Sequence, residues 1–212
     1  MGNVPSYEPP PMSDFRSRPM SIIDGNYVCM TPSNMFLRGL DNSTIEVVLS
    51  GQQDHPADWT VVPKKSSVLR LIKSQTLFNA STGAAMCTFM PDMASNRGKH
   101  LVFRGGIESA EERDDMLALR LKSAHVSRAI AFQGFTAEHE TLYILAPYHS
   151  EDIYVFVGDP KDGGGALVAQ AKNIAKPDHC NYQVEVSAGV DRAALVCMLL
   201  IAHRARQDWR SR

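Results

Sequence analysis

Along most of the chain, hydrophobic and polar residues alternate with the period of β-strands. Within residues 116–122, for example, Leu117, Leu119 and Leu121 fall on one face. The pattern predicts strands at Tyr27–Met30, Met35–Leu40, Thr44–Leu49, Trp59–Val62, Val68–Lys73, Thr76–Asn79, Ala85–Met90, His100–Arg104, Met116–Lys122, Ala129–Phe135, Thr141–Ala146, Ile153–Val157, Leu167–Lys172 and Tyr182–Ser187. No amphipathic helix pattern interrupts this series, which excludes a parallel sheet with crossover helices.

The stretch Ala193–Ala202 has a different pattern, AALVCMLLIA, which is apolar on every side. A helix of this kind must be enclosed by protein or by lipid. A bilayer core needs about 20 apolar residues, and this run is about half as long and is bounded by Asp191 and Arg204. We therefore predict a helix over about residues 191–208 that is enclosed by protein. Asp191 is expected at its N-cap or in its first turn, and Arg204 and Arg206 complement the helix dipole.

About a dozen strands followed by one apolar helix predict an all-β barrel with the helix inside. Closing a sheet into a barrel removes its exposed edges. A barrel of about twelve strands is too wide for its own side chains to fill, so another element must occupy the lumen. A helix of about 18 residues, at 1.5 Å per residue, has the length to do so.

Composition separates a short N-terminal region from the rest. Residues 1–24 contain Pro5, Pro9, Pro10, Pro11 and Pro19 but few large apolar residues, so we expect a flexible Pro-rich tail. Residues 25–212 form the predicted barrel domain. The net charge of −1 gives no general attraction to nucleic acid or anionic lipid. The four cysteines show no metal-like spacing, and no signal-peptide pattern appears, so we expect an intracellular, reduced protein.

Several segments carry a family resemblance. Asn181–Ala194 reads as a strand, a short turn and Val190-Asp191 leading directly into the apolar run. Upstream stand Leu77–Gly83 followed by a strand through Phe89, then His100–Gly105, then Gly158-Asp159 with Ala166–Gln170. In this order the segments resemble the LURP-one-related family, which shares its fold with the tubby C-terminal domain and is similar to the phospholipid scramblases. The resemblance implies about twelve mostly antiparallel strands around a central hydrophobic helix. Ala188-Gly189 departs from it, because the family usually has a proline-containing turn there.

The resemblance implies less about function than about fold. The LURP-one-related family has no agreed biochemical activity. Tubby domains bind phosphoinositides through basic residues on the barrel surface, but no individual residue of that site maps onto this chain. A lipid-binding function is therefore an expectation from the family's relatives.

Basic residues cluster in three places along the predicted strands. The candidate lipid- or anion-binding residues are Lys64, Lys65, Arg70, Lys73, Arg97, Lys99, Arg104, Arg120, Lys122 and Arg128, with His100 and His125 beside them. If neighbouring strands bring these together, they form a face for an inositol phosphate or a lipid headgroup. The alternative is the ordinary charged exterior of a barrel. The acidic run Glu108, Glu111, Glu112, Asp114 and Asp115 would offset their field.

The N-terminal region offers two further candidates. Met1-Gly2-Asn3-Val4-Pro5-Ser6 fits the myristoylation pattern, with Gly2 as the acceptor, although a chance match is the alternative. A single acyl chain binds membranes only marginally, so a second signal would be needed. Tyr7–Pro11 is a candidate polyproline ligand for a protein partner, and a stiff spacer is the alternative.

Motifs of catalysis are lacking in the sequence. It contains no G-x-S-x-G, no P-loop and no H-E-x-x-H, and His179-Cys180 has no second cysteine pair nearby. Glu138-His139-Glu140 is better explained as alternating surface charge than as an acid–base site. We predict no catalytic residue, no metal and no cofactor. A nucleic-acid partner is not expected, because such domains are basic and this chain is slightly acidic.

Three functions remain in order of preference. The first is a non-enzymatic, tubby-like barrel that binds a phosphoinositide or another anionic membrane lipid, cytoplasmic and peripheral at the membrane. The second is a soluble protein-interaction or regulatory scaffold with no lipid role. The third, scramblase-like lipid transport, is disfavoured by the short helix, by Asp191 and Arg192 at its start, and by the lack of an acylatable cysteine cluster.

Overall fold

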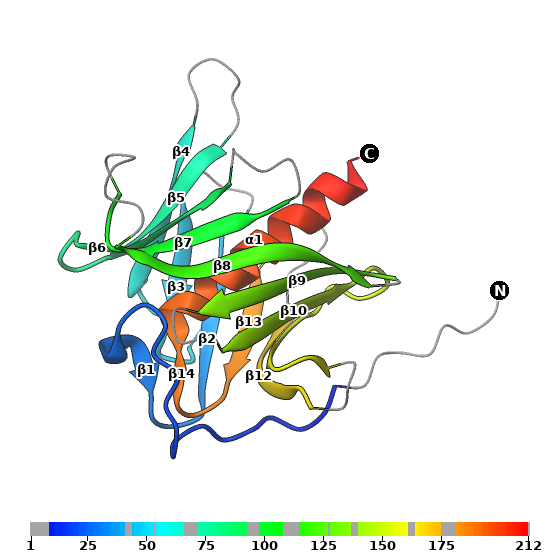
Figure 1. Ribbon diagram of the computed structural model, residues 1–212. Helices are drawn as coiled ribbons and strands as arrows, with labels where there is room; N and C mark the ends of the chain where they lie inside the picture. Colours follow the sequence, from blue (N-terminus) through cyan, green and yellow to red (C-terminus); the bar gives the residue numbers. More distant parts are fainter. Residues whose placement is uncertain are drawn as a thin grey trace.

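Figure 1 shows the computed structural model of the chain. The structure describes residues 9–40, 44–52, 54–65, 72–92, 98–107, 115–126, 128–136, 140–160, 164–174 and 181–211. Every structural statement below concerns these residues.

Twelve strands of the described residues close into one antiparallel barrel. They are β2 (Ser33–Arg38), β3 (Ile45–Val48), β4 (Trp59–Lys65), β5 (Ile72–Asn79), β6 (Ala85–Pro91), β7 (His100–Arg104), β8 (Leu117–Val126), β9 (Ala129–Thr136), β10 (Thr141–Pro147), β11 (Ile153–Val157), β12 (Ala166–Asn173) and β13 (Tyr182–Val186). Consecutive strands pair with each other, and β13 pairs with β2 to close the ring. The predicted fold class is confirmed.

The lumen is filled by helix α1 (Arg192–Arg210). Figure 1 shows it running obliquely through the barrel. Each residue from Ala193 to Ala202 is at most 2% exposed, so the apolar run is enclosed by protein as predicted. Asp191 is the N-cap, and its Oδ1 accepts a hydrogen bond from the Ala194 N–H at 3.1 Å. The helix thus begins where the sequence placed its start.

The two arginines predicted to complement the helix dipole have other surroundings. Arg206 is buried, and its guanidinium donates hydrogen bonds to the carbonyl oxygens of Glu151 and Asp152, both at 2.6 Å. Burial lowers the pKa of Arg204 to about 10. The basic residue of the last helical turn is Arg210.

Strand bounds differ from the prediction mainly around β5. The sequence suggested separate strands at Val68–Lys73 and Thr76–Asn79, whereas β5 runs without a break from Ile72 to Asn79. Residues 68–71 lie outside the described residues. A two-residue pair, β1 (Val28–Cys29) with β14 (Val190–Asp191), stands apart from the barrel and follows the 3-10 turn η1 (Gly25–Tyr27).

Residues 12–24 form what we call the N-terminal strap, and they correct the predicted flexible tail of residues 1–24. Met20, Ile22 and Ile23 of the strap are buried in the main core. Backbone hydrogen bonds join the strap to the barrel at Ser13, Phe15 and Met20, whose N–H groups donate to Leu167, Ala188 and Gly189. The domain therefore begins before residue 25. The packing of the strap could not be predicted from the sequence, because three buried side chains among prolines produce no periodic pattern.

Asp191 fastens the strap to the start of α1. Its Oδ2 accepts hydrogen bonds from the backbone N–H groups of Ile22 at 3.0 Å, Ile23 at 2.6 Å and Asp24 at 3.3 Å. Burial raises the pKa of this carboxyl, and the backbone hydrogen bonds act in the opposite direction. One side chain thus caps the helix and holds the segment that closes this end of the barrel.

The strap approaches the backbone at residue 189 so closely that a glycine is required there. This residue has φ +82°, and a Cβ atom added there would lie 2.3 Å from the carbonyl carbon and oxygen of Phe15. Only glycine fits both the backbone conformation and the space.

Antiparallel pairing sorts the strand connections into two sets. The connections that follow even-numbered strands lie at one end of the barrel, and those that follow odd-numbered strands lie at the other. Asp191 at the start of α1 lies at the strap, whereas Arg206 near its end contacts the β10–β11 connection. We call these the strap end and the helix-exit end.

Candidate anion-binding groove

A groove of about 160 Å³ crosses the outside of β7, β8 and β9. The register places Leu101 opposite Arg120, and Arg120 opposite Phe135, so these three side chains form a row across neighbouring strands. The lining residues are Asp92, Lys99, Leu101, Arg120, Leu121, Lys122 and Phe135. The groove therefore collects three of the predicted basic residues from segments distant in the sequence.

The charge of the groove is mainly positive. Lys99, Arg120 and Lys122 are exposed, and Asp92 is the one carboxylate among the lining residues. The ammonium of Lys122 lies 5.0 Å from the ring centroid of Phe135, which holds this cation at the edge of the groove by a cation–π contact. Cations beside an apolar floor suit a phosphate group carried on an organic body.

His100 does not add a cation to this groove. Its ring packs edge-on against the core residue Phe132, with 5.6 Å between centroids. Burial lowers the pKa of His100, against the opposing effect of a hydrogen bond with the backbone of Gly98.

The other predicted basic residues lie elsewhere. Lys64 is exposed on β4, opposite Ser74 of β5, and Lys65 and Lys73 belong to the same two strands. Lys64 does not line the groove, and the side chains of Lys65 and Lys73 lie outside what the structure describes. Arg70, Arg97 and the myristoylation candidate Gly2 lie outside the described residues. The predicted set of cations is thus divided among several places, and its anion-binding role stays a prediction.

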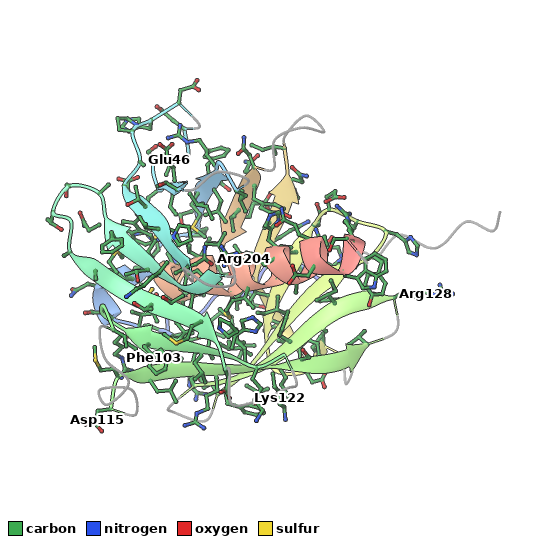
Figure 2. All side chains as sticks on the ribbon, turned by 90° about the horizontal axis from the view of Figure 1, so that it is seen from above. Glu46, Phe103, Asp115, Lys122, Arg128 and Arg204 are labelled. Atoms are coloured by element: carbon green, nitrogen blue, oxygen red, sulfur yellow. The ribbon has the colours of Figure 1, made fainter. Side chains whose placement is uncertain are left out.

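Arg104 has an internal contact instead. Its Nε donates to the carbonyl oxygen of Ile23 at 3.0 Å, and its Nη2 donates to that of Ile22 at 3.2 Å. These bonds fasten the strap from the side of β7. Arg128 is exposed just before β9, at the helix-exit end, with φ 65°. Figure 2 shows Lys122 and Arg128 along one hairpin, with Asp115 at the far end.

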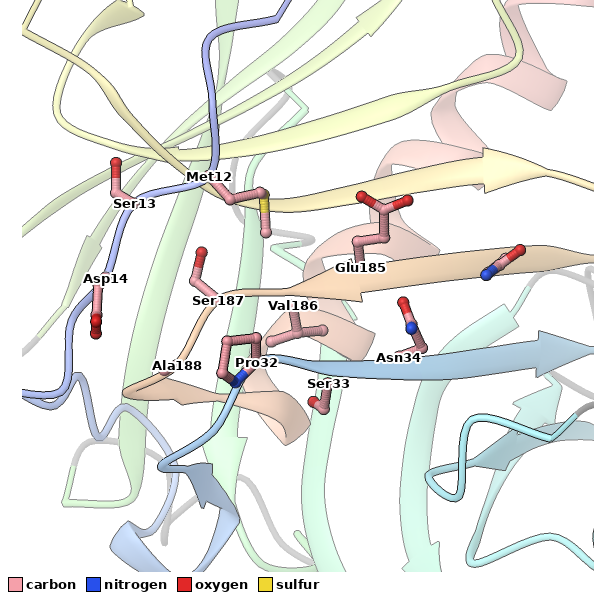
Figure 3. A pocket seen from close by; sticks show the side chains of 11 residues that line it. Met12, Ser13, Asp14, Pro32, Ser33, Asn34, Glu185, Val186, Ser187 and Ala188 are labelled. Atoms are coloured by element: carbon pink, nitrogen blue, oxygen red, sulfur yellow. The ribbon is translucent and has the colours of Figure 1, made fainter.

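A second groove, of about 410 Å³, lies between the strap and the paired strands β2 and β13 (Figure 3). Its carboxylates are already partnered, because Asp14 pairs with Arg16 and Glu185 pairs with Lys172. Their charges are therefore largely neutralised within the protein. This groove could not be predicted from the sequence, because one of its walls is the strap, a segment expected to be flexible.

Comparisons with known proteins add no assignment. The chain matches no family model, and neither a curated protein nor a solved structure is significantly similar to it. Among the described residues, no helix combines the length and apolar character needed to cross a bilayer.

Proposed function

We propose that this protein is a non-enzymatic barrel that binds phosphate-bearing headgroups of anionic membrane lipids, phosphoinositides included, in the groove of Lys99, Arg120 and Lys122. The observation that supports this proposal is their convergence around Leu101 and Phe135. The cations bind the phosphate oxygens through charge-assisted hydrogen bonds, and the apolar residues contact the carbon ring of the headgroup. Asp92 disfavours ligands that place a phosphate at its side of the groove.

Binding of soluble inositol 1,4,5-trisphosphate, measured by titration calorimetry, tests the proposal. The double variant Arg120→Gln/Lys122→Gln should bind at least about tenfold more weakly, because each hydrogen bond to a charged group contributes about 1.5–3 kcal/mol. Lys64→Gln is the matched control, since Lys64 is an exposed strand lysine outside the groove. Equal affinities of the double variant and the control would contradict the proposal.

The scaffold hypothesis is the outcome if the wild-type protein binds no inositol phosphate. In that case the Pro-rich segment that includes Pro9, Pro10 and Pro11 becomes the first place to seek a protein partner. Myristoylation of Gly2 is a separate proposal, tested by the intact mass of protein from a myristoylating host. It would add a membrane anchor to the groove, since one acyl chain alone binds marginally.

A further inference from the structure

Three segments meet at the helix-exit end. Arg128 stands at the β8–β9 turn, Tyr148 follows β10, and Trp209 lies in the last turns of α1. The Tyr148 N–H donates a hydrogen bond to the Arg128 carbonyl oxygen at 2.9 Å. The rings of Tyr148 and Trp209 are stacked, with centroids 4.3 Å apart and planes at 15°. We call Arg128, Tyr148 and Trp209 the aromatic tip.

The tip is held in place from below. The buried guanidinium of Arg206 donates to the carbonyl oxygens of Glu151 and Asp152, which fixes the β10–β11 connection onto α1. Arg210 pairs with the Glu151 carboxylate on the surface. The aromatic pair is thus ordered before any ligand arrives, which lowers the entropy cost of binding.

Exposure distinguishes this tryptophan from the other one in the chain. Trp209 is 48% exposed, whereas Trp59 is 5% exposed and belongs to the core. Arg128 adopts the left-handed conformation, which costs a residue other than glycine about 1–2 kcal/mol. Val126 pairs with Ala129, so the two-residue hairpin turn accounts for this conformation and sets Arg128 at the end of the hairpin.

The hairpin that leads to the tip is purely cationic. Residues 117–136 contain Arg120, Lys122 and Arg128 but neither aspartate nor glutamate. Lys122 lies four residues before the end of β8 at Val126, roughly 13 Å along the strand, and Arg128 follows in the turn. The groove and the tip therefore belong to one surface, which would attract an anionic membrane along its length.

We propose that the aromatic tip docks onto the interfacial region of an anionic lipid bilayer, with Trp209 and Tyr148 at the headgroup level and Arg128 beside a lipid phosphate. Indole and phenol rings favour this region because they combine an apolar body with one polar group. The inference rests on the proposed function in one respect, since the groove then binds a headgroup of the same membrane. Two linked contacts bind more tightly than either does alone.

Tryptophan fluorescence and vesicle sedimentation test the docking. On vesicles of phosphatidylcholine mixed with phosphatidylserine, the emission of Trp209 should shift to shorter wavelength. Trp209→Ala should weaken vesicle binding about tenfold or more, the loss expected for an aromatic anchor, and should abolish the shift. Met30→Ala is the matched control, because Met30 is 49% exposed and follows β1 at the strap end. Thermal melts of both variants confirm that they remain folded.

The outcomes separate this inference from the proposed function. Vesicle binding without an emission shift would overturn the docking, and so would equal binding by Trp209→Ala and Met30→Ala. If the protein still binds inositol trisphosphate in either case, the proposed function of the groove stands. The variant Arg120→Gln/Lys122→Gln should lose binding of inositol trisphosphate. If the emission of Trp209 still shifts on vesicles in this variant, the docking of the aromatic tip is supported independently of the groove. A shift that depends on protein concentration in the absence of vesicles would assign the tip to self-association and would also overturn the docking.

Discussion

The strap end and the helix-exit end of the barrel differ in which side chains they bury and which they expose. At the strap end, the Asp191 carboxylate is fully buried and accepts four backbone hydrogen bonds, and Arg104 donates to two strap carbonyls. At the helix-exit end, Trp209 is half exposed and Arg128 points to solvent. At the strap end these hydrogen bonds are made within the protein. At the helix-exit end the buried Arg206 also bonds internally, but Trp209 and Arg128 are presented outward.

Stability and binding therefore depend on different ends of the barrel. A buried charge that loses its partners costs several kcal/mol, so the strap end should tolerate little change. Exposed residues away from such networks change stability by only about 0.5 kcal/mol. Substitutions in the buried network around Asp191 should therefore destabilise the domain strongly, and those of the exposed residues Trp209 and Arg128 should leave it folded.

The largest effect is expected at Asp191. Asp191→Ala removes the helix cap and leaves the N–H groups of Ile22 and Ile23 buried without an acceptor, which should cost about 2–5 kcal/mol of unfolding free energy. Urea unfolding followed by circular dichroism measures it. Asp24→Ala is the control, because Asp24 caps only the exposed turn η1 and should cost about 1 kcal/mol. Similar losses in the two variants would show that Asp191 does not hold the strap.

A smaller loss is expected at Gly189. Gly189→Ala forces a methyl group against the Phe15 carbonyl and should destabilise the domain by about 2–4 kcal/mol, through overlap and the left-handed backbone. The displaced strap should also become sensitive to trypsin at Arg16 and Arg18. Gly83→Ala separates the two causes, because Gly83 has φ +70° but no atom within 4 Å of the added Cβ. If both variants lose only about 1 kcal/mol, the strap is not packed as described.

The smallest effect is expected at Glu151 of the helix-exit end. Its hydrogen bond to Arg210 lowers the pKa of this carboxyl below the usual 4.5. A carboxyl whose pKa is lower in the folded state stabilises the protein above its unfolded pKa, and this contribution is lost as the pH falls through the folded value. The melting temperature of wild type should thus slightly exceed that of Glu151→Gln at neutral pH, and the difference should vanish in acid. A difference that grows as the pH falls would contradict the pairing.

Alternation and the apolar run were sufficient to predict the architecture. The spacing of Leu117, Leu119 and Leu121 predicts β8, because side chains of a strand alternate between two faces. The run Ala193–Ala202 predicts an enclosed helix, because such a helix has no polar face that could be exposed to water. The cap at Asp191 followed from local chemistry alone. These features depend on near neighbours in the chain, which is why the sequence predicts them.

The strap, the groove and the aromatic tip depend on distant residues. Three such pairs form only in the closed barrel. Ile22 donates a hydrogen bond to Asp191, Lys99 and Arg120 line the same groove, and Tyr148 stacks on Trp209. In the sequence, Lys99, Arg120 and Lys122 are three of ten scattered cations, and nothing distinguishes them from Arg104, which holds the strap instead. Trp209 was not a candidate, because its exposure and its stacking on Tyr148 depend on residues far apart in the chain.

A barrel around an apolar helix can be predicted from the sequence alone, since periodicity and length are properties of consecutive residues. Which charges are used internally and which face outward is set only in the folded protein. That choice depends on strand register and on the path of the strap, and these are set by packing between residues far apart in the chain.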